Sequence, residues 1–120
     1  MRVAVTSAGK NLESNVDPRF GRAAYFIIVN PETMDYKVVE NIQNLNLPQG
    51  AGIQAGQTIA ENNVDILITG NCGPKAFKVL QNAGIKIITN AEGRVIDVIS
   101  KYKKGESESA NGPNVEGHWV

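Results

Sequence analysis

Apolar residues follow two different spacings along this chain, and each spacing predicts a different kind of element. Four short apolar runs, each bounded by turn residues, predict strands at 2–6, 24–29, 64–69 and 85–89. The first two have the continuous apolar character of strands that are buried on both faces. A more polar run, DYKVVEN at 35–41, follows the second strand after a short turn and predicts an edge strand in an antiparallel hairpin.

Three other stretches place apolar residues at helical spacing. The first predicts a helix over 51–62. The second predicts a helix from Pro74 to Gly84, because proline is favoured in a first helical turn and glycine commonly ends a helix. The third predicts a final amphipathic helix that begins near Val95 and stops at Gly105.

The resulting order, β-β-β-α-β-α-β-α, predicts an α/β fold with three layers. A strand meander followed by two right-handed crossovers favours a mixed five-stranded sheet in the order 3-2-1-4-5. Strand 2 is then antiparallel, helices cover both faces, and the topology is that of ribonuclease-H-like folds. We expect one domain over residues 1–105, followed by a polar, poorly ordered tail over 106–120 that is broken by glycine and proline.

Composition and charge narrow the classes of function. Twelve basic and twelve acidic residues give a formal net charge of zero, so no global field attracts nucleic acid or an anionic membrane. The longest apolar run is too short to cross a bilayer, and the start of the chain lacks a secretory signal. One cysteine excludes an internal disulfide. We therefore expect a cytoplasmic protein in which any anion site is local.

The predicted topology indicates where a ligand would bind. Strands 1 and 4 are neighbours whose connections leave in opposite directions, and open α/β sheets commonly bind ligands in the crevice at such a point. Two segments emerge there, residues 7–22 and residues 70–74. The arginine-bearing stretch DPRFGR and the lone cysteine are therefore expected to face each other.

The stretch DPRFGR has the features of a rigid turn that presents positive charge. Gly21 permits an unusual backbone conformation, and Phe20 is expected to point into the core and anchor the loop. Arg19 and Arg22 could then direct several N–H donors at an anion. In the alternative interpretation, Asp17 pairs with one arginine and solvent takes the other, because such surface pairs are common and weak.

The stretch GNCGP places Cys72 where a strand passes into a helix. The unpaired N–H groups of a first helical turn lower the pKa of a thiol and favour binding to a soft metal, with Asn71 or Cys72 as the helix cap. Gly73 would let the backbone approach a ligand closely. One thiol does not complete a metal site. Alternatively, Cys72 is a small residue that fills a tight turn.

Three other chemistries are disfavoured. The letters GAGIQA at 50–55 match a dinucleotide fingerprint, but a polar loop rather than a strand precedes them. Neither the first strand, at 2–6, nor the end of the fourth carries a carboxylate, so metal-dependent nuclease chemistry is not expected. His118 and Trp119 could bind a metal or a partner, but a histidine in a polar tail is usually solvated.

Four stretches together resemble a known family: RVAVTS, VDPRFGRAAYFIIV, GAGIQAGQTIAENNVDILITGNCGPKAF and LQNAGIKI. Their order and spacing are similar to the nitrogenase iron-molybdenum cofactor biosynthesis family, small domains related to dinitrogenase accessory proteins. The resemblance covers roughly residues 1–105. It implies a ribonuclease-H-like fold and the non-covalent carriage, without catalysis, of an anionic iron-sulfur or molybdenum-sulfur cluster. Its partners would be proteins that donate or accept the cluster.

This chain departs from the family pattern at one position. Many relatives that handle the cofactor carry His-Phe-Gly where this chain has Arg19-Phe20-Gly21. An imidazole can bond iron or molybdenum directly, whereas a guanidinium stays protonated and cannot. Arg19 can therefore contribute only charge and hydrogen bonds, which leaves room for a metal-sulfur species other than the nitrogenase cofactor.

Cluster binding is thus the leading hypothesis, with Cys72 as an optional metal ligand. The residues expected to hold the cluster are Arg19, Phe20, Gly21, Arg22, Asn71, Cys72 and Gly73. The alternative is a metal-free interaction or regulatory module that uses the edge strand at 35–41 and the tail. A thiol enzyme at Cys72 ranks last, because no histidine outside the tail could act as its base.

Overall fold

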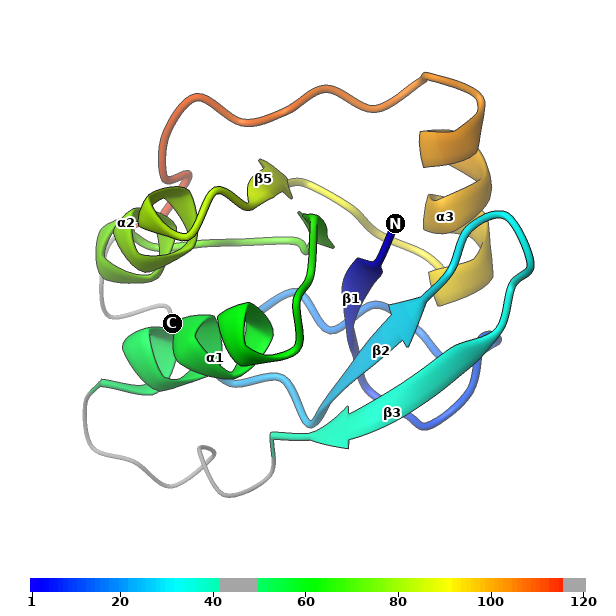
Figure 1. Cartoon of the computed structure of the whole chain (residues 1–120), viewed down its shortest axis with the longest axis horizontal. Helices are drawn as coiled ribbons and strands as arrows, with labels where there is room; N and C mark the ends of the chain where they lie inside the picture. The colour runs from blue at the N-terminus through cyan, green and yellow to red at the C-terminus, as the bar shows by residue number, and fades with distance from the viewer. Residues whose placement is uncertain (42–49, 116–120) are drawn as a thin grey trace.

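The computed structural model describes residues 1–41 and 50–115, which form five strands and three helices (Figure 1). In chain order these elements are β1 (Val3–Ser7), β2 (Tyr25–Val29), β3 (Tyr36–Glu40), α1 (Ala51–Glu61), β4 (Ile66–Ile68), α2 (Pro74–Asn82), β5 (Lys86–Ile88) and α3 (Val95–Lys103). All eight elements lie within the predicted segments or overlap them closely.

The strands form one mixed sheet in the order β3-β2-β1-β4-β5. The β1–β2 and β2–β3 pairs are antiparallel, whereas β1–β4 and β4–β5 are parallel. Val3 at the start of β1 lies opposite Val29 on one side and Ile66 on the other. The predicted α/β class, strand order and antiparallel β2 are confirmed. The ribonuclease-H-like assignment stays a prediction.

The continuous apolar strands are explained by two cores, one on each face of the sheet. Helices α1 and α2 cover one face, where Ile59 and Leu80 pack with Phe26 and Leu67. Helix α3 covers the opposite face, where its buried residues join Val3, Val5 and Ile68 (Figure 1). Successive strand residues point to opposite faces, so a strand between two helical layers needs apolar side chains at every position.

Helix α2 begins at Pro74, as predicted, but its cap is a different residue from the two that the sequence indicated. Its N-cap is Gly73, in an extended conformation, and Pro74 is the first helical residue. The prediction that Asn71 or Cys72 caps this helix is wrong. A proline disfavours helical backbone angles at the residue before it, so Pro74 fixes both the start of the helix and the extended cap.

Residues 106–115, which we name the strap, return from the end of α3 across the edge of the sheet. They contain no helix or strand, but Ala110 N donates to Ile87 O (2.6 Å) and Asn114 N donates to Cys72 O (3.1 Å). The domain boundary at residue 105 and poor order beyond it stay predictions. His118 and Trp119 lie outside the described residues. Among the helices of the described part, none has the length and apolar character to cross a membrane.

Candidate functional site

The point where β1 and β4 diverge is covered by the loop after β1. Asp17 N donates to Thr6 O (2.9 Å), and the Thr6 hydroxyl donates to Asp17 O (2.7 Å). The neighbouring Val16 N donates to Gly93 O (2.8 Å), which ties the loop to the start of α3. The expectation of an open crevice at this position is therefore wrong, because the loop's own backbone satisfies the polar groups at the strand end.

The two segments that we expected to face each other lie side by side. Arg19 and Asn71 form an isolated parallel bridge, in which Asn71 N donates to Pro18 O (2.6 Å) and Phe20 N donates to Asn71 O (3.2 Å). A Cβ atom added to Gly70 would lie 2.7 Å from Pro18 Cα, so only glycine allows this approach. The topology thus places DPRFGR beside the β4–α2 loop, as predicted.

Two buried residues, Phe20 and Asn41, hold the arginine-bearing loop against the core. Phe20 is fully buried, with its ring centroid 5.7 Å from that of Phe26, which confirms that it anchors the loop. The buried amide of Asn41 donates to Gly21 O (3.2 Å) and to Ala23 O (2.8 Å). These contacts fix the backbone on either side of Arg22.

The two arginines have different surroundings. The Arg19 side chain is 51% exposed, and its Nε lies 3.8 Å from Asp17 Oδ1. At that distance and exposure the pair is weak, so the guanidinium keeps donors that can reach a ligand. Arg22 is half-buried and has an interaction partner within the structure. The pairing of Asp17 with one arginine, given above as the alternative, is therefore present.

Cys72 belongs to the core. Its side chain is fully buried in the cluster that contains Phe20, Ala76 and Phe77, and burial raises the pKa of the thiol to about 12. The prediction of a lowered pKa is wrong, because desolvation of the thiolate outweighs the nearby helix end. The sulfur atom lies 3.8 Å from the backbone oxygen of Gly73, with which it forms a weak hydrogen bond. This environment favours the interpretation of Cys72 as a small residue that fills a tight turn.

Two hollows lie at the carboxyl ends of β4 and β5. The first, which we name the loop hollow, has a volume of about 380 Å³ and is lined by Pro18, Gly70, Asn71, Asn90, Ala91 and Glu92. The second, the strap hollow, has a volume of about 400 Å³ and shares Asn90, Ala91 and Glu92 with the first. The paired loops therefore form one wall of a continuous depression, not the two sides of a crevice.

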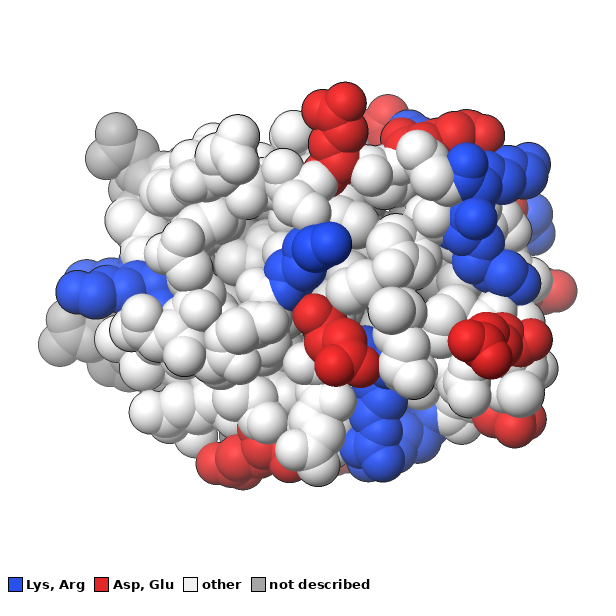
Figure 2. Space-filling view, turned by 45° about the horizontal axis from the view of Figure 1, so that its top comes forward, with Lys and Arg blue, Asp and Glu red and all other residues white. Residues whose placement is uncertain are grey.

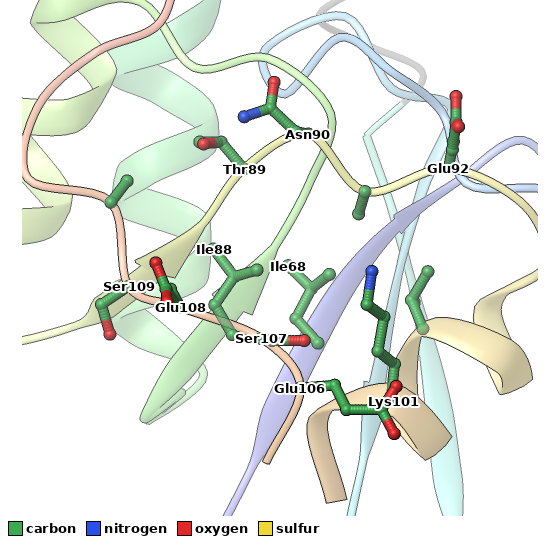
Figure 3. A pocket seen from close by; sticks show the side chains of 13 residues that line it. Ile68, Ile88, Thr89, Asn90, Glu92, Lys101, Glu106, Ser107, Glu108 and Ser109 are labelled. Atoms are coloured by element: carbon green, nitrogen blue, oxygen red, sulfur yellow. The ribbon is translucent and has the colours of Figure 1, made fainter. Parts of the chain in front are cut away.

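The strap hollow combines an apolar floor with charged walls (Figure 3). Ile68 and Ile88 form the floor, and Lys101 extends from α3 toward the strand ends. The strap contributes Glu106, which is drawn beside Lys101 in Figure 3, and Glu108. Within the described ranges, no three His, Cys, Asp or Glu side chains are grouped so as to hold a metal ion.

Two asparagines that the sequence analysis did not select join these loops. Asn90, in a left-handed conformation (φ 64°), donates its backbone N–H to Gly70 O (2.8 Å). The side chain of Asn114 accepts from Cys72 N (2.8 Å) and donates to Gly70 O (3.1 Å). Turn propensity after the last strand could have indicated Asn90. No local pattern marks Asn114, because its contacts come from the path of the strap.

Charge over the molecule is mixed. Figure 2 shows basic and acidic side chains interspersed on the face that it presents, in agreement with a formal net charge of zero. No large patch of one charge marks a site on the described part of that face. An anion would have to be recognised by local donors such as the half-exposed Arg19.

The fold and the depression at its strand ends define a class of small three-layer α/β proteins with a polar site at the carboxyl edge of the sheet. The chain belongs to the dinitrogenase iron-molybdenum cofactor family, whose model matches residues 1–105. The predicted family is thereby confirmed.

Similar proteins cover almost the whole chain. The apo form of the orange protein from Desulfovibrio gigas is 43% identical with a TM-score of 0.93, covering 95% of this chain and 96% of that one. A Thermotoga protein of the DUF35 family, described as NifB-type, is 37% identical with a TM-score of 0.82, covering 97% and 98% of the two chains. An uncharacterised protein from Methanocaldococcus jannaschii is 29% identical over 111 residues, which are 90% of this chain and 94% of its own.

Proposed function

We propose that this protein binds an anionic metal-sulfur cluster non-covalently in the loop hollow and carries it between a donor and an acceptor protein. The observation that carries the proposal is the pairing of Arg19 with Asn71. This backbone pairing puts Arg19, whose side chain is 51% exposed, next to Pro18 and Asn71, two of the residues that line the loop hollow. A guanidinium offers several charge-assisted N–H donors in fixed directions, which suits the sulfide and oxide groups of such a cluster.

The surrounding residues favour retention without metal–protein bonds. The thiol of Cys72 is buried and its pKa is raised, so it offers no thiolate at the surface. The side-chain amides of Asn71 and Asn90 can supply further N–H donors at the rim. In this proposal, Phe20 and Gly21 position the loop, and Arg22 adds positive charge. Gly73 lets the backbone at the N-terminus of α2 approach the cargo. Cys72 would act as a ligand only if the turn opened.

The family supports a carrier more than a catalyst. Its members are accessory or carrier-type proteins, and the relatives include the orange protein and a NifB-type protein. An arginine at position 19, where the resemblance implies histidine in many relatives, is consistent with a cargo held by charge and hydrogen bonds. We place the carrier in the cytoplasm, where donors and acceptors of such clusters would meet it.

Anaerobic reconstitution tests the proposal. The protein is incubated with iron, sulfide and molybdate, with and without copper, since soft copper(I) binds sulfide ligands readily. It is then separated from small molecules, and visible absorption and metal content are measured. We expect wild type and Arg94→Gln to retain cluster, because Arg94 is paired with Asp97 on the surface (2.9 Å). Arg19→Gln should retain about tenfold less, as expected for a lost charge-assisted contact.

A negative result would be equally informative. If no visible absorption remains with the wild-type protein under conditions that load another cluster-binding family member, the proposal is wrong. If Arg19→Gln and Arg94→Gln retain equal amounts of cluster, a cluster site exists but the Arg19–Asn71 pairing does not form it.

A metal-free interaction module is the second candidate. Strand β3 lies at the edge of the sheet, and Tyr36 on it is 43% exposed, so a partner strand could add there. Pull-down assays with the full chain and with a chain lacking residues 106–120 would separate the two functions. Partners retained in the absence of any cluster uptake would favour the module.

A further inference from the structure

One side chain of the strap contacts residues that line the loop hollow. Asn114 Nδ2 donates to Gly70 O (3.1 Å) and lies 3.3 Å from both Asn71 Oδ1 and Asn90 Oδ1. Gly70, Asn71 and Asn90 are three of the six residues that line the loop hollow. A ligand in this hollow and the side chain of Asn114 would therefore contact the same groups.

Asn114 also occupies a donor that an anion would use. Its Oδ1 accepts a hydrogen bond from Cys72 N (2.8 Å), at the end of the β4–α2 loop. The carbonyl of Asn114 thus stands where an electron-rich ligand atom would accept the same bond. Its amide group also donates to the side-chain oxygens of Asn71 and Asn90, so both side chains change partners when the strap leaves.

The charge of the strap acts in the same direction. Glu106 and Glu108 both line the strap hollow, which adjoins the loop hollow through Asn90, Ala91 and Glu92. Two carboxylates at this position disfavour an anion nearby, and Lys101 in the same hollow offsets part of that effect while the strap is closed. When the strap leaves, the carboxylates leave with it and Lys101 stays, so entry of an anion becomes more favourable. The strap therefore opposes anion binding by occupation and by charge.

The strap has a defined point from which it can swing. Gly105 ends α3 in a left-handed conformation (φ 74°), and the strap begins at the next residue. Between Gly105 and Asn114, the backbone contact of the strap with the sheet is Ala110 N to Ile87 O (2.6 Å). Apart from this bond, the contacts that must break are those of Asn114. The strap has no helix or strand of its own and is exposed or half-buried along its length, as is typical of segments that open locally.

We propose that the strap is an internal competitor for the cargo site: closed, it occupies through Asn114 polar groups of three residues that line the loop hollow, and cluster binding requires its displacement. This inference rests on the proposed function, because it assigns a regulator to the same site. Displacement of the strap also uncovers β5 at the edge of the sheet, so loading changes the surface that a partner meets.

The experiment measures binding of tetrathiomolybdate, a dianionic metal sulfide, to the full chain by anaerobic titration. Three variants are compared with wild type: Asn114→Ala, the double variant Glu106→Gln/Glu108→Gln, and Asn111→Ala as the control. Asn111 is an exposed asparagine on the same strap. Hydrogen exchange at the Cys72 amide is followed in the same proteins without ligand, to show whether the strap has opened.

We expect Asn114→Ala to bind tetrathiomolybdate about tenfold more tightly than wild type, since the ligand no longer competes with the Asn114 hydrogen bonds. Exchange at the Cys72 amide should accelerate in the same variant. The double glutamine variant should bind about threefold more tightly, and Asn111→Ala should match wild type.

The outcomes separate the two proposals. If all four proteins bind tetrathiomolybdate with equal affinity, or Asn114→Ala binds more weakly, the strap is not a competitor, while the cargo site stands. If none of them binds tetrathiomolybdate or any reconstituted cluster, the proposed function is wrong and the competition proposal fails with it. The double variant changes only exposed side chains, so it remains informative if Asn114→Ala unfolds.

Discussion

The hydroxyl oxygens of Thr6 and Thr69 lie 2.9 Å apart, both completely buried, where the adjacent strands β1 and β4 end. The Thr6 hydroxyl also donates to the Asp17 carbonyl, so this pair joins the two central strands to the arginine-bearing loop. A buried contact between two hydroxyl groups therefore lies where the candidate site begins.

Replacement of Thr6 by valine should destabilise the fold. The change keeps the shape of the side chain but leaves the Asp17 carbonyl and the Thr69 hydroxyl without a buried partner, at a cost of about 1–3 kcal/mol. The free energy of unfolding, measured in urea, tests this. Thr58→Val is the control, because the Thr58 hydroxyl bonds only its own helix at the surface. Equal stability of the two variants would contradict the role of the buried pair.

Gly70→Ala should separate the two loops of the site. An added Cβ would lie 2.7 Å from Pro18 Cα and 2.8 Å from Pro18 O, and backbone atoms at such distances must move. We expect a loss of about 1–3 kcal/mol of stability, as for overpacked positions. We also expect altered amide chemical shifts at Arg19 and Asn71.

Gly112→Ala is the matched control for this substitution. No atom lies within 4 Å of the Cβ that would be added there. Unfolding curves and amide spectra of Gly112→Ala should resemble wild type. If Gly70→Ala behaved in the same way, the close approach of Gly70 and Pro18 would not be needed for the fold.

Cys72 should react slowly in the folded protein. Its sulfur is buried and its pKa is raised to about 12, so both access and thiolate content are low near neutral pH. Iodoacetamide should modify it about 100-fold or more slowly than in the urea-unfolded chain, because the reaction must wait for local opening. Rapid modification of the native protein would show that the thiol reaches solvent and would revive the thiol-enzyme hypothesis.

The same thiol should make stability depend on alkaline pH. Its pKa rises from 9.0 to about 12 on folding, so the folded chain holds the proton more tightly than the unfolded chain. The stabilisation is complete below pH 9.0 and is lost as the pH rises toward about 12. Unfolding free energies of wild type should therefore fall more steeply between about pH 9 and about pH 12 than those of Cys72→Ala. Parallel curves would contradict this.

Arg19→Lys should separate the effect of charge from that of geometry at the proposed site. Lysine keeps the positive charge but loses the planar fork of donors. We expect tetrathiomolybdate to bind Arg19→Lys a few-fold less tightly than wild type and more tightly than Arg19→Gln. Added salt should weaken binding to wild type and Arg19→Lys more than to Arg19→Gln, because exposed charges are screened. Titrations of the three proteins at low and high salt test this prediction. Equal salt dependence of all three would show that Arg19 does not contribute to binding.

Much of the fold could be predicted because apolar spacing and connection rules constrain it strongly. Short strands such as β4 (Ile66–Ile68) are apolar at every position, and helices over 74–82 and 95–103 show one apolar face each. Right-handed crossovers then leave few orders for five strands. The same rules placed the stretch DPRFGR beside the β4–α2 loop.

The details of the site could not be predicted, because they depend on side-chain direction and on contacts distant in sequence. Cys72 precedes a helix, but the extended Gly73 turns its sulfur into the core, where desolvation governs the pKa. The loop that covers the ends of β1 and β4 is held by backbone bonds that no motif marks. Asn114 makes its contacts with residues more than twenty positions away, so no local pattern could indicate it.

The burial of Cys72 has a consequence for how the protein withstands oxidants. The chain contains no second cysteine, and the only sulfhydryl is enclosed by Phe20, Ala76 and Phe77. Sulfenic acid formation and covalent crosslinking of two copies both need a sulfur that reagents can reach. Folding therefore shelters the molecule from this form of damage, and a crosslinked species in a preparation would report chains that had first lost their native packing.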